Sequence, residues 1–115
     1  MEISHKAISD GVIVVTPSGK LNMVHAHRLR EEVDAILAKG HNRIVVDLTN
    51  VEFLDSSGLG ALIGCLKAAR QANGDLRIAS PTEQVKLVLQ LTNLDRVLTP
   101  YTSAESAYVN VWIAP

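Results

Sequence analysis

The chain has 115 residues, of which 47% are hydrophobic and 20% charged, a composition that suits one globular domain with its own core. Eleven basic and twelve acidic residues leave a net charge of −1, so nothing indicates a basic stripe for nucleic acid or a polybasic run for a membrane surface. The lone Cys65 excludes an internal disulfide and fits a reducing compartment. Residues 1–6 lack the apolar segment of a signal peptide, and the longest apolar-rich stretch, 59–66, is far too short to span a bilayer. We therefore expect a cytoplasmic protein.

The N-terminal third predicts a hairpin and then a helix. Ile8 and residues 12–15 indicate two short strands joined at Asp10-Gly11, and the second strand is expected to stop at Pro17-Ser18-Gly19. Apolar side chains at helical spacing then predict a helix that ends at Gly40. Its apolar stripe consists of Leu29, Val33, Ile36 and Leu37.

The middle of the chain predicts a buried strand and a second helix. Residues 44–48 form a β-branched run of the kind that is covered on both faces in a parallel sheet. Residues 50–55 are expected to form a loop, and the helix after it should end near Asn73-Gly74. The apolar positions of this helix are Leu59, Leu62, Ile63, Leu66 and Ala69.

The C-terminal third is less regular. Residues 76–79 predict a short strand, Thr82 is a suitable N-cap for a third helix, and residues 97–98 suggest a last short strand. Residues 103–107 could begin a helix, whereas Val109, Val111 and Ile113 alternate as in a strand. The apolar side chains of the third helix are expected in the core rather than in a partner groove; they are Val85, Leu87, Val88, Leu89, Leu91 and, just beyond, Leu94.

This alternation of strands and helices predicts an α/β fold, a single domain over residues 1–115. We expect a mostly parallel sheet of four to five strands with an antiparallel N-terminal strand and right-handed crossovers. Functional loops of such folds gather beyond the carboxyl ends of the strands. Residues 19–23 and 50–57 are the two candidate loops.

The segment with the clearest chemistry is Asp55-Ser56-Ser57-Gly58-Leu59-Gly60. It joins a strand to a helix, so its serines lie where backbone N–H groups lack partners and the helix dipole favours a phosphate. Its two glycines lower helix stability by roughly 1 kcal/mol each relative to alanine, a cost that close approach of a partner's backbone would offset. From the residues alone, an ordinary N-cap at Asp55 or Ser56 followed by a tight turn explains the segment equally well.

This hexapeptide, preceded by Val46-Asp47-Leu48 and Val51-Glu52-Phe53-Leu54, resembles the signature of the STAS domain. More narrowly, it is similar to that of the bacterial anti-sigma-factor antagonists. Gly19-Lys20-Leu21-Asn22 stands where the family usually has Gly-x-Leu-Asp, and residues 80–94 resemble its third-helix region. The resemblance spans nearly the whole chain.

The resemblance implies partner switching in transcription regulation, without catalysis by this chain and without a cofactor. The unmodified antagonist binds an anti-sigma factor that is also an ATP-dependent serine kinase, and so frees a sigma factor or another target. Phosphorylation of the serine after the aspartate, here Ser56 with Ser57 as the alternative, releases the partner, and a PP2C-type phosphatase reverses the modification. The implied partner-binding residues are Leu21, Asn22, Met23, Asp55, Ser56, Ser57, Gly58, Leu59, Gly60, Ala61 and Gly64.

Some features depart from the family or leave other functions open. Asn22 replaces the usual aspartate and Lys20 is basic where acidic residues are frequent, so the partner contacts here are expected to differ.

A STAS subunit of a larger lipid-transport or stress-sensing complex, without phosphorylation, is the alternative function. Asp55 and Ser56 as a hydrolase pair would lack a base and an oxyanion partner. His25 and His27 do not share a helix face, so we expect no metal site there.

Overall fold

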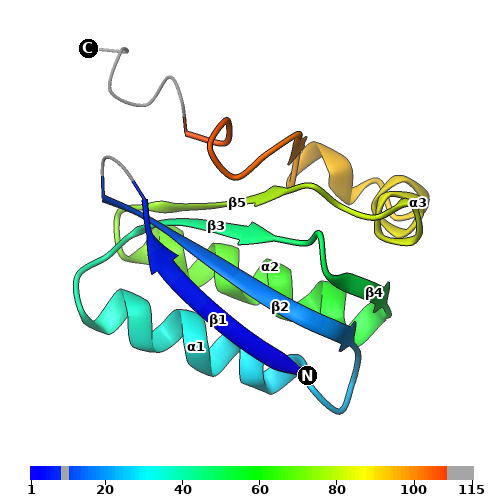
Figure 1. The fold of residues 1–115 in the computed structure, drawn as a ribbon, viewed down its shortest axis with the longest axis horizontal. Coiled ribbons are helices and arrows are strands. Elements are labelled where there is room, and N and C mark those ends of the chain that lie inside the picture. Colours follow the sequence, from blue (N-terminus) through cyan, green and yellow to red (C-terminus); the bar gives the residue numbers. More distant parts are fainter. Residues whose placement is uncertain (9–10, 109–115) are drawn as a thin grey trace.

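In residues 1–8 and 11–108, which the computed structural model describes, six strands form one mixed sheet with three α-helices packed against it (Figure 1). The strand order is β1-β2-β3-β5-β6, with β4 beside the end of β2, and only the β1–β2 pair is antiparallel. The strands are β1 (Glu2–Ala7), β2 (Val12–Leu21), β3 (Arg43–Asp47), β4 (Val51–Leu54), β5 (Asp75–Ala79) and β6 (Pro100–Tyr101). The predicted fold class is confirmed, with six strands in place of four to five.

The N-terminal hairpin is longer than the sequence pattern indicates. Strand β1 pairs with β2 from Glu2↔Ser18 to Ala7↔Ile13, and Gly11 at the turn has a left-handed φ of 74°, while its neighbour Asp10 lies outside the described residues. The expectation that this strand stops at residues 17–19 is wrong, because β2 continues to Leu21. Its two halves pair with different strands: Val12–Val15 with β3 and Gly19–Leu21 with β4. Pro17 lies between these halves, so its missing N–H removes no ladder bond to β3 or β4.

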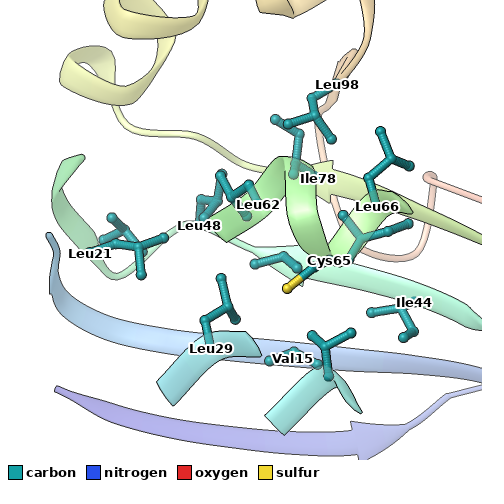
Figure 2. Packing of buried hydrophobic residues seen from close by; sticks show 14 of the residues in the cluster. Val15, Leu21, Leu29, Ile44, Leu48, Leu62, Cys65, Leu66, Ile78 and Leu98 are labelled. Carbon is teal, nitrogen blue, oxygen red and sulfur yellow. The ribbon is translucent and has the colours of Figure 1, made fainter. Parts of the chain in front are cut away.

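Helices α1 (Ala26–Ala38) and α2 (Ser56–Gln71) cover one face of the sheet (Figure 1). The predicted apolar stripes of both helices face the strands and each other, and Gly40 takes the left-handed conformation, with a φ of 91°, just after α1. Figure 2 shows this core, in which Cys65 lies among aliphatic side chains. Cys65 therefore packs as a small buried hydrophobe.

Two local predictions in the second half of the chain are wrong. Residues 51–54 are not a loop but strand β4, because the end of β2 offers them a parallel partner. Residues 97–98 are not a strand. They follow the 3₁₀ helix η2 (Leu94–Arg96), and both of their N–H groups donate to the carbonyl of Leu94, so the last strand of the described chain comes at β6 instead.

The opposite face of the sheet is covered by the segment 104–108. Val14 of β2 and Val45 of β3 pack there against Ala107 and Tyr108, and the Tyr108 hydroxyl lies 2.9 Å from the carbonyl oxygen of Ile44. Residues 103–108 form turns rather than the start of a helix. The segment of alternating Val109, Val111 and Ile113, with Trp112, lies outside the described residues.

Helix α3 (Glu83–Leu91) packs at the β4 end of the sheet (Figure 1). Its Val85 and Leu89 are buried, but Leu87 and Leu91 are 53% and 74% exposed, so the expectation that they belong to the core is wrong. These two leucines lie one turn apart on the side of α3 that faces away from the sheet. Within the described chain, no helix combines the length and the apolar character that crossing a membrane requires.

Candidate functional site

The site is built at the junction of β4 and α2. Asp55 leaves the strand with an extended backbone (φ −105°, ψ −174°) and is the N-cap of α2, its Oδ1 accepting a hydrogen bond from the N–H of Gly58 at 2.8 Å. The helix therefore begins at Ser56. Of the two N-caps that the sequence allowed, the structure has Asp55.

The same carboxylate joins the two loops that the sequence singled out. Its Oδ2 accepts a hydrogen bond from the backbone N–H of Met23 at 3.2 Å, so the chain after β2 is held against the start of α2. Asn22 stabilises this loop from within, because its Oδ1 accepts hydrogen bonds from the N–H groups of Val24 at 3.1 Å and His25 at 3.3 Å. The amide thus supplies an acceptor for the turn without the negative charge of an aspartate.

Ser56 is exposed, and its hydroxyl forms no hydrogen bond with any described residue. Ser57, the alternative acceptor, is half-buried. The Asp55 carboxylate uses both of its oxygens for backbone N–H groups rather than for the Ser56 hydroxyl. The arrangement leaves Ser56 as the more accessible of the two hydroxyls at this junction.

The two glycines of the hexapeptide lie in different surroundings, and only one of them is required by packing within the domain. Gly58 is buried, and a Cβ atom there would lie 2.0 Å from the carbonyl oxygen of Leu21 and 2.8 Å from a methyl group of Leu54. Gly60 is exposed, with nothing within 4 Å of such an atom. The proposal that a partner's approach explains both glycines is therefore wrong for Gly58, whose requirement is internal packing.

Three expected partner-binding residues are not on the surface. Leu21 is fully buried, Leu59 is 6% exposed, and Gly58 is buried between β2 and β4, so these residues support the site from inside the core. The sequence does not reveal which side of each turn faces inward. The remaining residues are exposed or half-buried and are called the switch surface below: Asn22, Met23, Asp55, Ser56, Ser57, Gly60, Ala61 and Gly64.

Sequence reasoning missed the residue that supports β4. The side-chain amide of Gln84 pairs with the backbone of Leu54, its Oε1 accepting from the N–H at 2.9 Å and its Nε2 donating to the carbonyl at 3.1 Å. The Thr82 hydroxyl donates to the Val51 carbonyl at 3.1 Å instead of capping α3. The Gln84 side chain thus forms with β4 the hydrogen bonds that a neighbouring strand would form. No local sequence pattern predicts this contact.

Exposed apolar side chains lie within the switch surface and next to it in the sequence. Met23 is 75% exposed, and Val24 and Phe53 are also open to solvent. Phe53 lies on β4, which leads directly into Asp55. Among residues 1–8 and 11–108, no three His, Cys, Asp or Glu side chains are close enough together to hold a metal ion. The site therefore offers a hydroxyl, a capped helix start and an apolar rim.

Comparison with known proteins agrees with this geometry. The model of the STAS domain family matches residues 5–107. A protein of Thermotoga maritima assigned as an anti-sigma factor antagonist is 38% identical over 105 residues, covering 90% of this chain and 93% of that one. The chain is a member of the STAS family of anti-sigma factor antagonists.

Further relatives carry the same name or the same fold. The anti-sigma F factor antagonist of Paenibacillus polymyxa is 31% identical over 98 residues, covering 84% of this chain and 84% of its own. The crystal structure of the Thermotoga maritima antagonist superposes on 96% of this STAS chain and 94% of its own, with a TM-score of 0.86 at 36% identity. SpoIIAA of Bacillus, in the phosphorylated form, shares the fold at 19% identity, with a TM-score of 0.71 over 96% of this chain and 99% of its own.

Proposed function

We propose that this chain is a protein–protein switch controlled by phosphorylation of Ser56. The unphosphorylated form binds an anti-sigma factor that is also an ATP-binding serine kinase, and so frees a sigma factor or another target. Phosphate on Ser56 releases that partner, and a PP2C-type phosphatase restores the binding form. The observation that supports this most is the exposed Ser56 hydroxyl, free of hydrogen bonds to described residues, on the first residue of α2.

The phosphate would act on the interface more than on the fold. It adds about −1.5 to −2 charges next to the carboxylate of Asp55. The α2 dipole and the first-turn N–H groups of Ser56 and Ser57 favour that charge, whereas Asp55, which already holds the Gly58 N–H, opposes it. Because these effects oppose each other and Ser56 is in solvent, we expect little rearrangement of the domain.

The surroundings of Ser56 suit a protein partner. Met23, Val24 and Phe53 expose apolar surface on the two segments that meet at Asp55, and exposed apolar groups with a polar rim are typical of interaction sites. A bulky dianion within such a contact weakens binding about a hundredfold if it costs roughly 3 kcal/mol. The names of the relatives support an anti-sigma factor as the partner, and the phosphorylated SpoIIAA supports the modification.

The proposal is tested by incubating the chain with its cognate kinase and ATP and mapping the phosphate by mass spectrometry. We expect one phosphate on the wild type and on Ser57→Ala, and none on Ser56→Ala, which should still bind the kinase. Ser56→Asp should weaken binding at least about tenfold while its thermal unfolding stays unchanged. Equal phosphorylation of Ser56→Ala and the wild type would refute the assignment. A chain that copurifies with membrane-transport components and is never phosphorylated would instead fit the non-phosphorylated STAS subunit.

A further inference from the structure

A polar concavity lies at the opposite end of α2 from Ser56. It has a volume of about 230 Å³ and is enclosed by the last turn of α2, by β5 and by the segment from η2 to β6. Arg70 lines it and follows Ser56 by 14 residues on α2, so the concavity lies about 21 Å from Ser56 along the helix axis. It therefore shares no residue with the switch surface.

The lining of this pocket is strongly basic for a chain whose net charge is −1. Three arginines from three different elements line it, Arg70 of α2, Arg77 of β5 and Arg96 of η2, against one acidic residue, Asp75. Asp75 lies 3.5 Å from the Nε of Arg70 and 3.2 Å from that of Arg77. Arg96 forms no ion pair with a residue that the structure describes, so a surplus of two positive charges remains.

Arg77 is held in place before any ligand arrives. Its Nη1 donates to the carbonyl of Ala107 at 2.6 Å. Its guanidinium carbon lies 4.3 Å from the ring centre of Tyr108 and 5.8 Å from that of Tyr101. An ordered guanidinium loses little conformational freedom when it binds an anion, which favours affinity.

We infer that this pocket binds a phosphate dianion, either free or as the head of a small phosphate monoester. Guanidinium groups bind phosphate through paired charge-assisted hydrogen bonds, and the hydroxyls of Thr99 and Tyr101 supply further donors on the lining. The volume is below the range of drug-sized ligands, which fits a small anion. A dianion would replace Asp75 as the partner of Arg70, whose ion pair of 3.5 Å is the longer of the two.

Titration of the ¹⁵N-labelled full chain, followed by NMR at constant ionic strength, tests this inference. One arm adds inorganic phosphate, a second adds glycerol phosphate, and chloride is the control. We expect saturable shifts of the amides of Arg70, Arg77, Arg96 and Thr99 and none at Ser56. Binding in both arms would assign the pocket to the phosphate group of an ester, and binding of inorganic phosphate alone would assign it to the free ion.

Two charge-matched variants make the test specific. Arg96→Gln removes an exposed cation without a described ion pair and should fold normally, with phosphate affinity lowered about tenfold or more. Arg30→Gln removes the same charge from α1, outside the pocket, and should bind phosphate as the wild type does. Equal losses in both variants, or shifts that do not saturate in the wild type, would overturn the inference. This outcome is independent of the phosphorylation of Ser56.

Discussion

Both ends of α2 are fixed to the domain by a glycine that packs against a backbone carbonyl. At the start, Gly58 lies against the carbonyl of Leu21, and just after the end, Gly74 lies against the carbonyl of Asn42, where a Cβ atom would come within 1.9 Å of the oxygen. At each end a side chain also satisfies backbone groups. Asp55 accepts from the N–H of Gly58 at the start, and Asn42 donates to the carbonyl of Ala72 at 3.1 Å after the end.

What differs between the ends is the charge that surrounds them. The start of α2 carries Asp55 and an exposed Ser56, so a phosphate there has to be attached covalently to stay. The far end faces Arg70, Arg77 and Arg96, where a phosphate can be held without a bond. Close packing at glycine therefore positions the helix, whereas the side chains left in solvent decide what each end can do.

The largest loss of stability is expected when the glycine–carbonyl packing at either end of α2 is disrupted. Gly58→Ala and Gly74→Ala should each destabilise the domain by about 3 kcal/mol or more, because each methyl group would overlap a backbone carbonyl that cannot move alone. Urea unfolding of both variants measures this. A loss below about 1 kcal/mol at either position would show that the neighbouring strand end yields easily and that the packing there does not fix the helix.

The next effect concerns only the start of α2. Gln84→Ala should lower the free energy of unfolding by about 2 kcal/mol, since it removes two hydrogen bonds and leaves the Leu54 backbone unpaired at the edge of β4. Hydrogen exchange at Leu54 and Asp55 should accelerate, while exchange at β5 stays as in the wild type. Leu87→Ala, on the exposed side of the same helix, is the control and should change stability by less than about 0.5 kcal/mol.

The elements with a regular period were predictable from the sequence, and those that depend on distant partners were not. The apolar stripes of α1 and α2 and the β-branched run of β3 follow from spacing alone. Strand β4 has only four residues and is a strand because β2 and Gln84 pair with it from elsewhere in the chain. Pairing of this kind leaves no local signal.

The candidate site shows the same division. The start of a helix at Asp55 or Ser56 follows from residue types in sequence, and the structure decides between the two N-caps in favour of Asp55. The burial of Leu21 and the internal reason for Gly58 depend on a contact between segments 37 positions apart, so the sequence indicates the segment but not which of its residues face inward. The pocket of three arginines is not predictable from the sequence, because its members come from separate elements.

Between its two ends, α2 turns an apolar face toward the core, and Cys65 belongs to that face. Burial raises the pKa of the Cys65 thiol from 9.0 to about 12, so the folded chain holds this proton more tightly than the unfolded chain. The resulting stability is complete below pH 9 and is lost as the pH rises toward 12, by about 1.4 kcal/mol at pH 10. Urea unfolding at pH 8 and pH 10 should show this loss in the wild type, and Cys65→Ala should lack it. The same slope in both proteins would mean that the thiol is not the titrating group.

The smallest effect on stability is the sharpest probe of the switch surface. Gly60→Ala places a methyl group in open space on α2, so it should raise the free energy of unfolding by about 0.5 to 1 kcal/mol through helix propensity, opposite in sign to Gly58→Ala. If the partner's backbone approaches α2 at Gly60, the same methyl group should nevertheless weaken binding of the cognate kinase, measured by calorimetry, by about tenfold. Gln71→Ala, at an exposed position in the last turn of α2 and outside the switch surface, serves as the binding control. Unchanged affinity of Gly60→Ala would show that the partner does not contact this side of α2 and would place the interface nearer to Met23 and Phe53. Gly60 would then be required neither for stability nor for recognition.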